Sequence, residues 1–135
     1  MVEIRWIQRF ENFKKANENL NQVAECIKNN GIDKIYTMAL IQAFEMAFEL
    51  AWKTIKDYLE YNGTKTDTPR NAIKEAFSAN LIVEGQQWID MMEARNKTSH
   101  TYKEEFANQT AQEILNIYTR ILSDLEKKLE GEING

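Results

Sequence analysis

Apolar residues recur every three or four positions along most of this chain, which is the spacing of one face of an α-helix. Residues that end helices are rare, since one proline and five glycines occur among 135 residues. The sequence also lacks the alternating β-branched runs that would predict strands. Because few turns are available, the chain has to form a few long elements. We therefore predict an all-α fold, an antiparallel up-and-down bundle of about five helices similar to a four-helix bundle.

The boundaries of the predicted helices follow from the apolar stripes and from capping signals. Asp33 is a candidate N-cap, and Thr68 followed by Pro69 is a start signal for a short helix. Thr101 and Glu104 have the spacing of a capping box for the last helix. The predicted ranges are Arg5–Asn29, Asp33–Tyr61, Pro69–Ala79, Gln86–Arg95 and Thr101–Leu129.

Charge and composition limit the classes of protein to which this chain can belong. The formal net charge is −4, whereas a freestanding nucleic-acid-binding domain is usually basic. Any RNA contact must therefore come from a local patch or from a cleft between two chains. Because the sequence shows neither a membrane-spanning apolar run nor a signal peptide, we expect a cytoplasmic protein without membrane contact. We expect residues 1–135 to form one domain, with residues 130–135 as a disordered tail and Cys26 as a buried apolar side chain.

The second predicted helix is apolar on nearly every side, so its polar residues are informative. These residues follow steps of three or four and share one face: Gln42, Glu45, Glu49, Lys53 and Lys56. One interpretation is a solvated stripe with a Glu49–Lys53 ion pair. The other is that Glu45 or Glu49 points inward and holds a cation such as Arg95, because a buried charge needs a partner. The sequence leaves both open, and we include Glu49 as a supporting residue of the candidate site.

Polar side chains that suit catalysis are concentrated where the last two predicted helices meet. This junction holds Arg95, Asn96, Ser99, Tyr102 and the only histidine, His100. His100 could take the proton of a ribose 2′-hydroxyl or donate one to the leaving oxygen. Arg95 could stabilise charge on the phosphorus centre, so the pair suits metal-free cleavage of RNA. Asn96 could orient either group, and Ser99 is a supporting candidate.

A structural interpretation of this junction is the alternative. A lone histidine at a helix junction is commonly a surface or capping residue, and Tyr102 by itself is more often a packing residue. The chain would then be a plain helical interaction protein. One histidine and one cysteine far apart cannot form a His/Cys metal cluster, and no glycine-rich phosphate loop occurs. We therefore expect neither a metal ion nor a cofactor.

One motif at the junction resembles that of a known family. The segment RNKTSHTY, residues 95–102, resembles the R-x4-H-x-Y motif of the HEPN superfamily. The resemblance is strongest to the small HepT-like proteins that are paired with a minimal nucleotidyltransferase. Three further segments are similar to that group in the same order: FELAWKTIKDYL (48–59), TPR (68–70) and WIDMME (88–93). The resemblance therefore covers nearly the whole chain.

The resemblance implies a helical bundle, usually a homodimer, with Arg95 and His100 lining a cleft at the subunit interface. It also implies one of two functions. In the first, the chain is the toxin of a toxin–antitoxin pair, a metal-independent RNase that the partner nucleotidyltransferase silences by adding AMP to Tyr102. In the second, the chain is a non-catalytic subunit that binds the substrate of a two-component nucleotidyltransferase.

Overall fold

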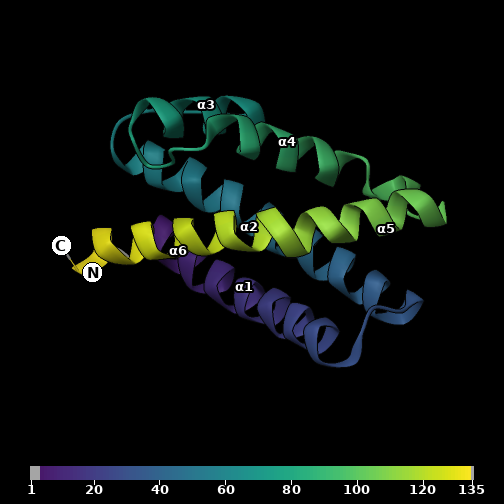
Figure 1. Ribbon diagram of the computed structural model, residues 1–135. Helices are drawn as coiled ribbons and strands as arrows, with labels where there is room; N and C mark the ends of the chain where they lie inside the picture. The colour runs from purple at the N-terminus through teal and green to yellow at the C-terminus, as the bar shows by residue number, and fades with distance from the viewer. Residues whose placement is uncertain (1–3, 135) are drawn as a thin grey trace.

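The computed structural model describes residues 4–134, in which the regular elements are all helical (Figure 1). The helices are α1 (Arg5–Asn30), α2 (Lys34–Tyr61), α3 (Pro69–Ser78), α4 (Gly85–Asn96), α5 (Glu104–Glu113) and α6 (Thr119–Asn134). A 3₁₀ turn, Thr98–His100, separates α4 from α5, and a π-helical segment, Ile114–Tyr118, joins α5 to α6 in one continuous rod. The long helices run up and down, which confirms the predicted all-α bundle.

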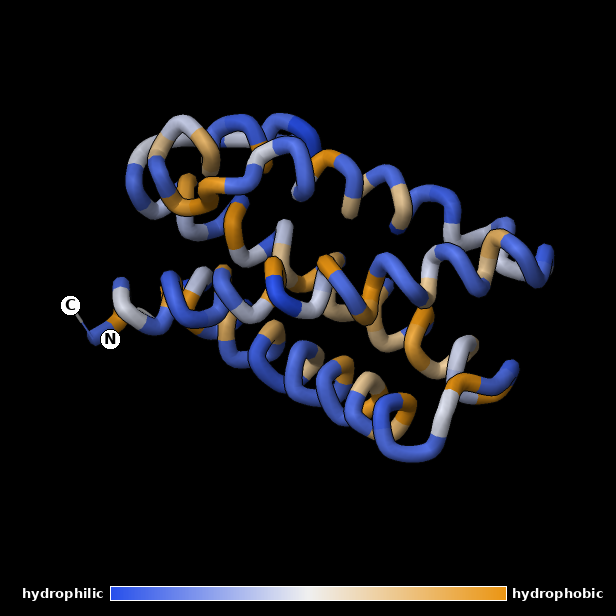
Figure 2. Tube along the Cα trace, viewed as in Figure 1, coloured by the Kyte–Doolittle hydropathy of each residue, from blue (hydrophilic) through white to orange (hydrophobic). Residues whose placement is uncertain are grey.

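Helix α2 lies at the centre of the bundle and contacts α1, α3, α4, α5 and α6. The Phe44 ring stacks on Tyr118 of the π-helical segment with 5.5 Å between centroids. The Phe48 ring lies 6.3 Å from Trp88 of α4. Hydrophobic residues recur along every helix with hydrophilic residues between them (Figure 2). Neither α2 nor any other helix within residues 4–134 is long and apolar enough to cross a membrane.

Hydrogen bonds confirm two of the predicted helix starts. The Asp33 carboxylate accepts the backbone N–H of Tyr36 at 2.8 Å at the start of α2. The Thr68 hydroxyl accepts the backbone N–H of Asn71 at 3.2 Å at the start of α3. Gly31 follows α1 with a φ of 83°, a conformation that side-chain-bearing residues rarely adopt. These local signals explain why the first three helices lie close to their predicted ranges.

The start of the last helix differs from the prediction. The capping box expected at Thr101 and Glu104 is wrong, because the Thr101 hydroxyl donates to the Thr98 carbonyl at 2.8 Å instead. Helix α5 begins at Glu104, and its N-cap position, Lys103, makes no side-chain capping bond. The break is therefore held by contacts within the 3₁₀ turn and not by a cap on α5.

The end of the last helix also differs from the prediction. Helix α6 continues to Asn134, so the expected end at Leu129 and the disordered tail from Glu130 are wrong, while Gly135 lies outside the described residues. Leu129 is fully buried, and Glu130 lies 3.6 Å from the Lys14 ammonium of α1. Packing against α1 thus extends the helix beyond the point where the apolar pattern ends.

Cys26 is exposed, so the predicted buried thiol is also wrong. The buried positions of this part of α1 are Leu20, Ala24 and Ile27. Cys26 lies two residues after Ala24 and one before Ile27, which turns it away from the face that packs on the bundle. The helical setting of a cysteine was therefore not enough to predict its burial.

Candidate functional site

Five of the six predicted site residues, all except Glu49 of α2, lie at one end of the bundle, where α4 passes through the 3₁₀ turn into α5 (Figure 1). Arg95 is in the last turn of α4, and His100 is the last residue of the 3₁₀ turn. Asn96, Ser99 and His100 are exposed, and 77% of the Tyr102 surface is accessible. The structure therefore brings the five predicted residues to one solvent-facing junction.

Short-range backbone hydrogen bonds give this junction a defined shape. The N–H of His100 donates to the Lys97 carbonyl at 2.9 Å, and the N–H of Thr101 donates to the Thr98 carbonyl at 3.2 Å. The N–H of Lys103 donates to the His100 carbonyl at 3.1 Å. These bonds join residues three positions apart, so the chain keeps a tight helical path between α4 and α5.

Thr98 is the buried residue of the 3₁₀ turn, with 6% of its surface exposed. Its Oγ1 lies 2.9 Å from Oε2 of Glu45 and 2.8 Å from the Arg95 carbonyl oxygen. Glu45 belongs to α2 and precedes Thr98 by 53 residues. This side-chain contact therefore ties the motif-bearing junction to the central helix.

Glu45 is also the ionic partner of Arg95. Its Oε2 lies 3.8 Å from Nη1 of Arg95, and the two side chains are 37% and 33% exposed. Glu45 thus pairs with Arg95 as one interpretation of this face expected, but it is not the buried inward charge that was predicted, since 37% of its side chain is exposed. Glu49 pairs with Lys53 at 3.3 Å, as the other interpretation expected.

The guanidinium of Arg95 is only partly satisfied by these contacts. The distance of 3.8 Å to Glu45 is too long for a hydrogen bond, and Nε is buried without a hydrogen-bond partner in residues 4–134. The buried Nε is out of reach of an incoming anion, but the Arg95 side chain is 33% exposed, and a guanidinium forms its stronger hydrogen bonds with charged acceptors. Arg95 is therefore suited to bind a phosphate group.

An acidic groove of about 300 Å³ lies beside the junction, between α4 and the α5–α6 rod. Its lining includes the carboxylates Asp90, Glu93 and Glu113, with Lys97 and Tyr118. Within residues 4–134, however, no three His, Cys, Asp or Glu side chains come together as metal ligands would. The excess of carboxylates disfavours a phosphate inside this groove.

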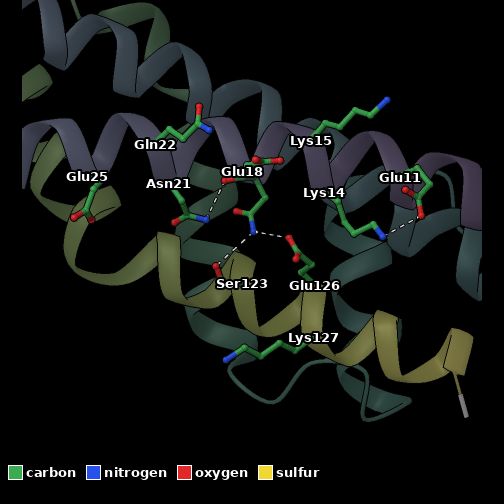
Figure 3. A pocket seen from close by; sticks show the side chains of 11 residues that line it. Glu11, Lys14, Lys15, Glu18, Asn21, Gln22, Glu25, Ser123, Glu126 and Lys127 are labelled. Atoms are coloured by element: carbon green, nitrogen blue, oxygen red, sulfur yellow. Dashed lines mark hydrogen bonds and ion pairs between the residues drawn. The ribbon is translucent and has the colours of Figure 1, made fainter.

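A larger groove lies elsewhere, between α1 and α6. It has a volume of about 830 Å³, and Figure 3 shows polar and charged side chains around it. It is formed by α1 and α6, where the Asn17 amide donates to Ser123 and Glu126 at 3.4 and 3.0 Å. None of the predicted site residues lines it. Since its charges are mixed and Lys14 pairs with Glu11 at 3.0 Å, we assign it to the packing of these two helices.

The fold and the junction define the class of this protein, a helical bundle with an Arg/His/Tyr motif before its last long helix. The family described as "nucleotidyltransferase substrate binding protein like" matches residues 8–131. The chain therefore belongs to this family. The resemblance that the motif indicated is thus confirmed.

Individual relatives are consistent with this family. The probable ribonuclease HepT of Haemophilus influenzae is 35% identical over 72 residues, 50% of this chain and 49% of that protein. The chain thus spans about half the length of this curated relative.

Solved structures share the fold over most of the chain. A protein of Thermus thermophilus is similar with a TM-score of 0.79 and 28% identity, over 87% of this chain and 98% of that chain. An H. influenzae protein, described as having the fold of a substrate-binding domain of a nucleotidyltransferase, is similar with a TM-score of 0.81 and 25% identity, over 90% and 98%. The tri-AMPylated HEPN toxin of Shewanella oneidensis in complex with MNT antitoxin has a TM-score of 0.75 and 14% identity, over 97% and 99%, and shows likeness of fold alone.

Sequence reasoning missed Thr98, which was treated only as part of a helix break. A signal was present, because a threonine can bond the carbonyl of the residue three positions before it, and Arg95 stands at that spacing. The π-helical segment that holds Tyr118 had no comparable signal in the apolar pattern. Both features depend on side chains that meet across the bundle.

The environment of Tyr118 predicts how the stability of the protein changes at alkaline pH. Burial and the hydrogen bond from its hydroxyl to Glu113 raise the pKa of Tyr118 above its ordinary value of 10.0. The unfolded chain loses this proton near pH 10 while the folded chain retains it, so stability present below that pH is lost as pH rises further. In denaturant unfolding from pH 8 to 11, the free energy of unfolding of Tyr118→Phe should fall less steeply with pH than that of the wild type. At pH 7 the variant should be less stable than the wild type by about 1 kcal/mol, because it lacks the hydrogen bond.

The matched control is Tyr61→Phe, because Tyr61 is 63% exposed. This variant should keep the wild-type slope of unfolding free energy against pH. Equal slopes in wild type and Tyr118→Phe would contradict the assignment.

Proposed function

We propose that this chain is a HEPN toxin-like, metal-independent endoribonuclease of a two-component system with a minimal nucleotidyltransferase. The observation that supports this most is the junction itself. Arg95 lies 3.8 Å from Glu45 with 33% of its side chain exposed, and His100 is exposed five residues later in the family motif. A cationic group for phosphate and a proton-transfer group therefore lie in one short segment.

The proposed reaction is transesterification at an RNA phosphate. A histidine takes the proton of the 2′-hydroxyl, the 2′-oxygen bonds to phosphorus, and the bond from phosphorus to the 5′-oxygen breaks. The leaving oxygen then receives a proton, while Arg95 stabilises the charge on the phosphoryl oxygens. The reaction uses both a base and an acid, and each chain has one histidine, so a cleft made by two chains would supply both.

An uncovered apolar stripe supports a homodimer. Ile35, Met38 and Met46 lie along one face of α2 and are 76%, 63% and 58% exposed. Their spacing places them on the face that also holds Glu45. A second copy of the chain that covers this stripe would therefore lie next to Arg95.

Tyr102 is the proposed acceptor of AMP. Its side chain is among the most exposed large side chains, and its ring lies 6.4 Å from the His100 ring. A partner enzyme could reach such a phenol without unfolding the bundle. An attached AMP would place bulk and negative charge beside His100 and would compete with RNA for Arg95.

A non-catalytic substrate-binding subunit is the second candidate. The description of the matched family and that of the H. influenzae structural relative favour it. The acidic groove beside the junction also limits the surface on which RNA could lie. In this case Arg95 would hold the phosphate of a nucleotide, and no RNA would be cleaved.

The role of His100 can be tested with His100→Ala. The variant should lose at least about 100-fold in RNA cleavage rate and should no longer inhibit growth, because the proton transfer is lost. Asn108→Ala, an exposed change in α5, is the matched control and should keep both activities. Equal cleavage and toxicity of His100→Ala would refute the catalytic role. A wild-type chain that cleaves no RNA, but supports nucleotide transfer when mixed with the partner, would favour the second candidate.

Modification of Tyr102 can be tested by mass spectrometry. Co-expression with the proposed partner nucleotidyltransferase should add the mass of AMP to the peptide that contains Tyr102, while the peptide with Tyr61 stays unmodified. Tyr102→Phe should escape modification and remain toxic in the presence of the partner, since the phenol is not used in cleavage. An AMP group on a different residue would contradict the proposal.

The homodimer can be tested with Ile35→Lys, which places a charge in the apolar stripe. The variant should be monomeric in light scattering where the wild type is a dimer, because burial of the added charge is costly. Val83→Lys is the matched control, since Val83 is 80% exposed in the connection between α3 and α4. A dimer that survives Ile35→Lys but not Val83→Lys would place the interface elsewhere.

A further inference from the structure

We propose that Glu45 and Thr98 are positioning residues that set Arg95 and His100 relative to each other. This inference rests on the proposed ribonuclease function. It is based on the observation that one carboxylate of α2, that of Glu45, contacts both Arg95 and Thr98 of the motif segment. Glu45 attracts the Arg95 side chain directly, and it holds the turn that ends at His100 through the hydroxyl of Thr98.

The position of the Arg95 side chain depends on Glu45. Its side chain is long and flexible, and burying its Nε without a partner is unfavourable. Glu45 is the ionic partner that keeps the guanidinium at the end of α4, at 3.8 Å from Nη1. The next carboxylate on the same face, Glu49, pairs with Lys53. Glu45 is therefore the carboxylate that orients Arg95.

The 3₁₀ turn is attached to α2 through Thr98. Ser99 and His100 are exposed, whereas the Thr98 side chain is inserted toward α2 with 6% of the residue exposed. The Thr98 carbonyl also accepts the hydroxyl of Thr101 at 2.8 Å. Thr98 is thus the residue through which the 3₁₀ turn is fixed to the body of the bundle. Since His100 is two residues later in this rigid turn, its position depends on that contact.

The link between Thr98 and Glu45 depends on the hydroxyl proton of Thr98. The Thr98 hydroxyl has one proton and two acceptors, the Glu45 carboxylate at 2.9 Å and the Arg95 carbonyl at 2.8 Å. A charged acceptor forms the stronger bond, so the proton points to Glu45 when that group is ionised. Valine has nearly the same shape as threonine but cannot donate. Thr98→Val therefore removes the link to Glu45 with little change in packing.

The test compares Thr98→Val with Thr98→Ser and with Thr54→Val. We expect Thr98→Val to lower kcat for RNA cleavage by about 10-fold to 100-fold with KM nearly unchanged, since a small misplacement of a catalytic group has a cost of this order. Thr98→Ser retains the hydroxyl and should recover most of the rate. Thr54 is fully buried in α2 and donates to the Leu50 carbonyl at 2.6 Å, so Thr54→Val is a matched loss of a buried hydroxyl away from the junction. Its kcat should stay within about 3-fold of wild type.

Glu45→Gln separates the two contacts of the carboxylate. Its amide oxygen can still accept the Thr98 hydroxyl, but it no longer neutralises Arg95. We expect a lower kcat together with a KM that is equal to or below that of the wild type, because the guanidinium is freed to attract phosphate. A Glu45→Gln enzyme with wild-type kcat would show that Glu45 does not orient Arg95.

Hydrogen exchange provides a readout that does not depend on activity. In Thr98→Val, the backbone amides of His100, Thr101 and Lys103 should exchange at least about 10-fold faster than in Thr54→Val, because the turn has lost its anchor. If the wild type cleaves no RNA but this local exchange increases, the ribonuclease function fails and the positioning role stands. If cleavage is intact in Thr98→Val and its junction amides exchange as in Thr54→Val, the positioning role is overturned.

Discussion

The burial of α2 between the other helices is the constraint on which the rest of this structure depends. Phe44 and Phe48 are almost fully buried, and their rings pack on Tyr118 and Trp88, which sets the places of the α5–α6 rod and of α4. Glu45 directly follows Phe44, so the rotation of α2 that buries the aromatic ring also turns the carboxylate toward the junction. The core and the candidate site are therefore linked through one turn of one helix.

Electrostatics confines the candidate site to a small area. The chain is acidic, and the groove beside the junction is lined by the carboxylates Asp90, Glu93 and Glu113. Positive side chains at the junction, Arg95 and Lys103 among them, offer a local region that attracts phosphate. A small positive region on an acidic protein supports a function in which a nucleic acid or nucleotide is held at a few contacts. It also agrees with the proposal that two chains together form the cleft.

Features that depend on neighbouring residues were predictable, and features that depend on distant contacts were not. The Asp33 and Thr68 caps could be predicted because each bonds an N–H three residues away. The capping box at Thr101 failed because its hydroxyl had a competing acceptor in the turn before it. The end of α6 was predicted wrongly because packing against α1, and not the local pattern, decides it. The burial of Cys26 was predicted wrongly because it was inferred from residue type, whereas the apolar pattern of α1 places Cys26 off the buried face.

The sequence by itself determined the helical class, the approximate helix ranges and the grouping of Arg95, His100 and Tyr102, because all of these depend on residues close together in the chain. The tertiary structure alone decided which carboxylate serves Arg95. Glu45 and Glu49 are one turn apart on the same face of α2, so no local pattern distinguishes them. The choice depends on where the end of α4 lies against α2, a contact between residues far apart in the chain that only the packing of the whole bundle defines.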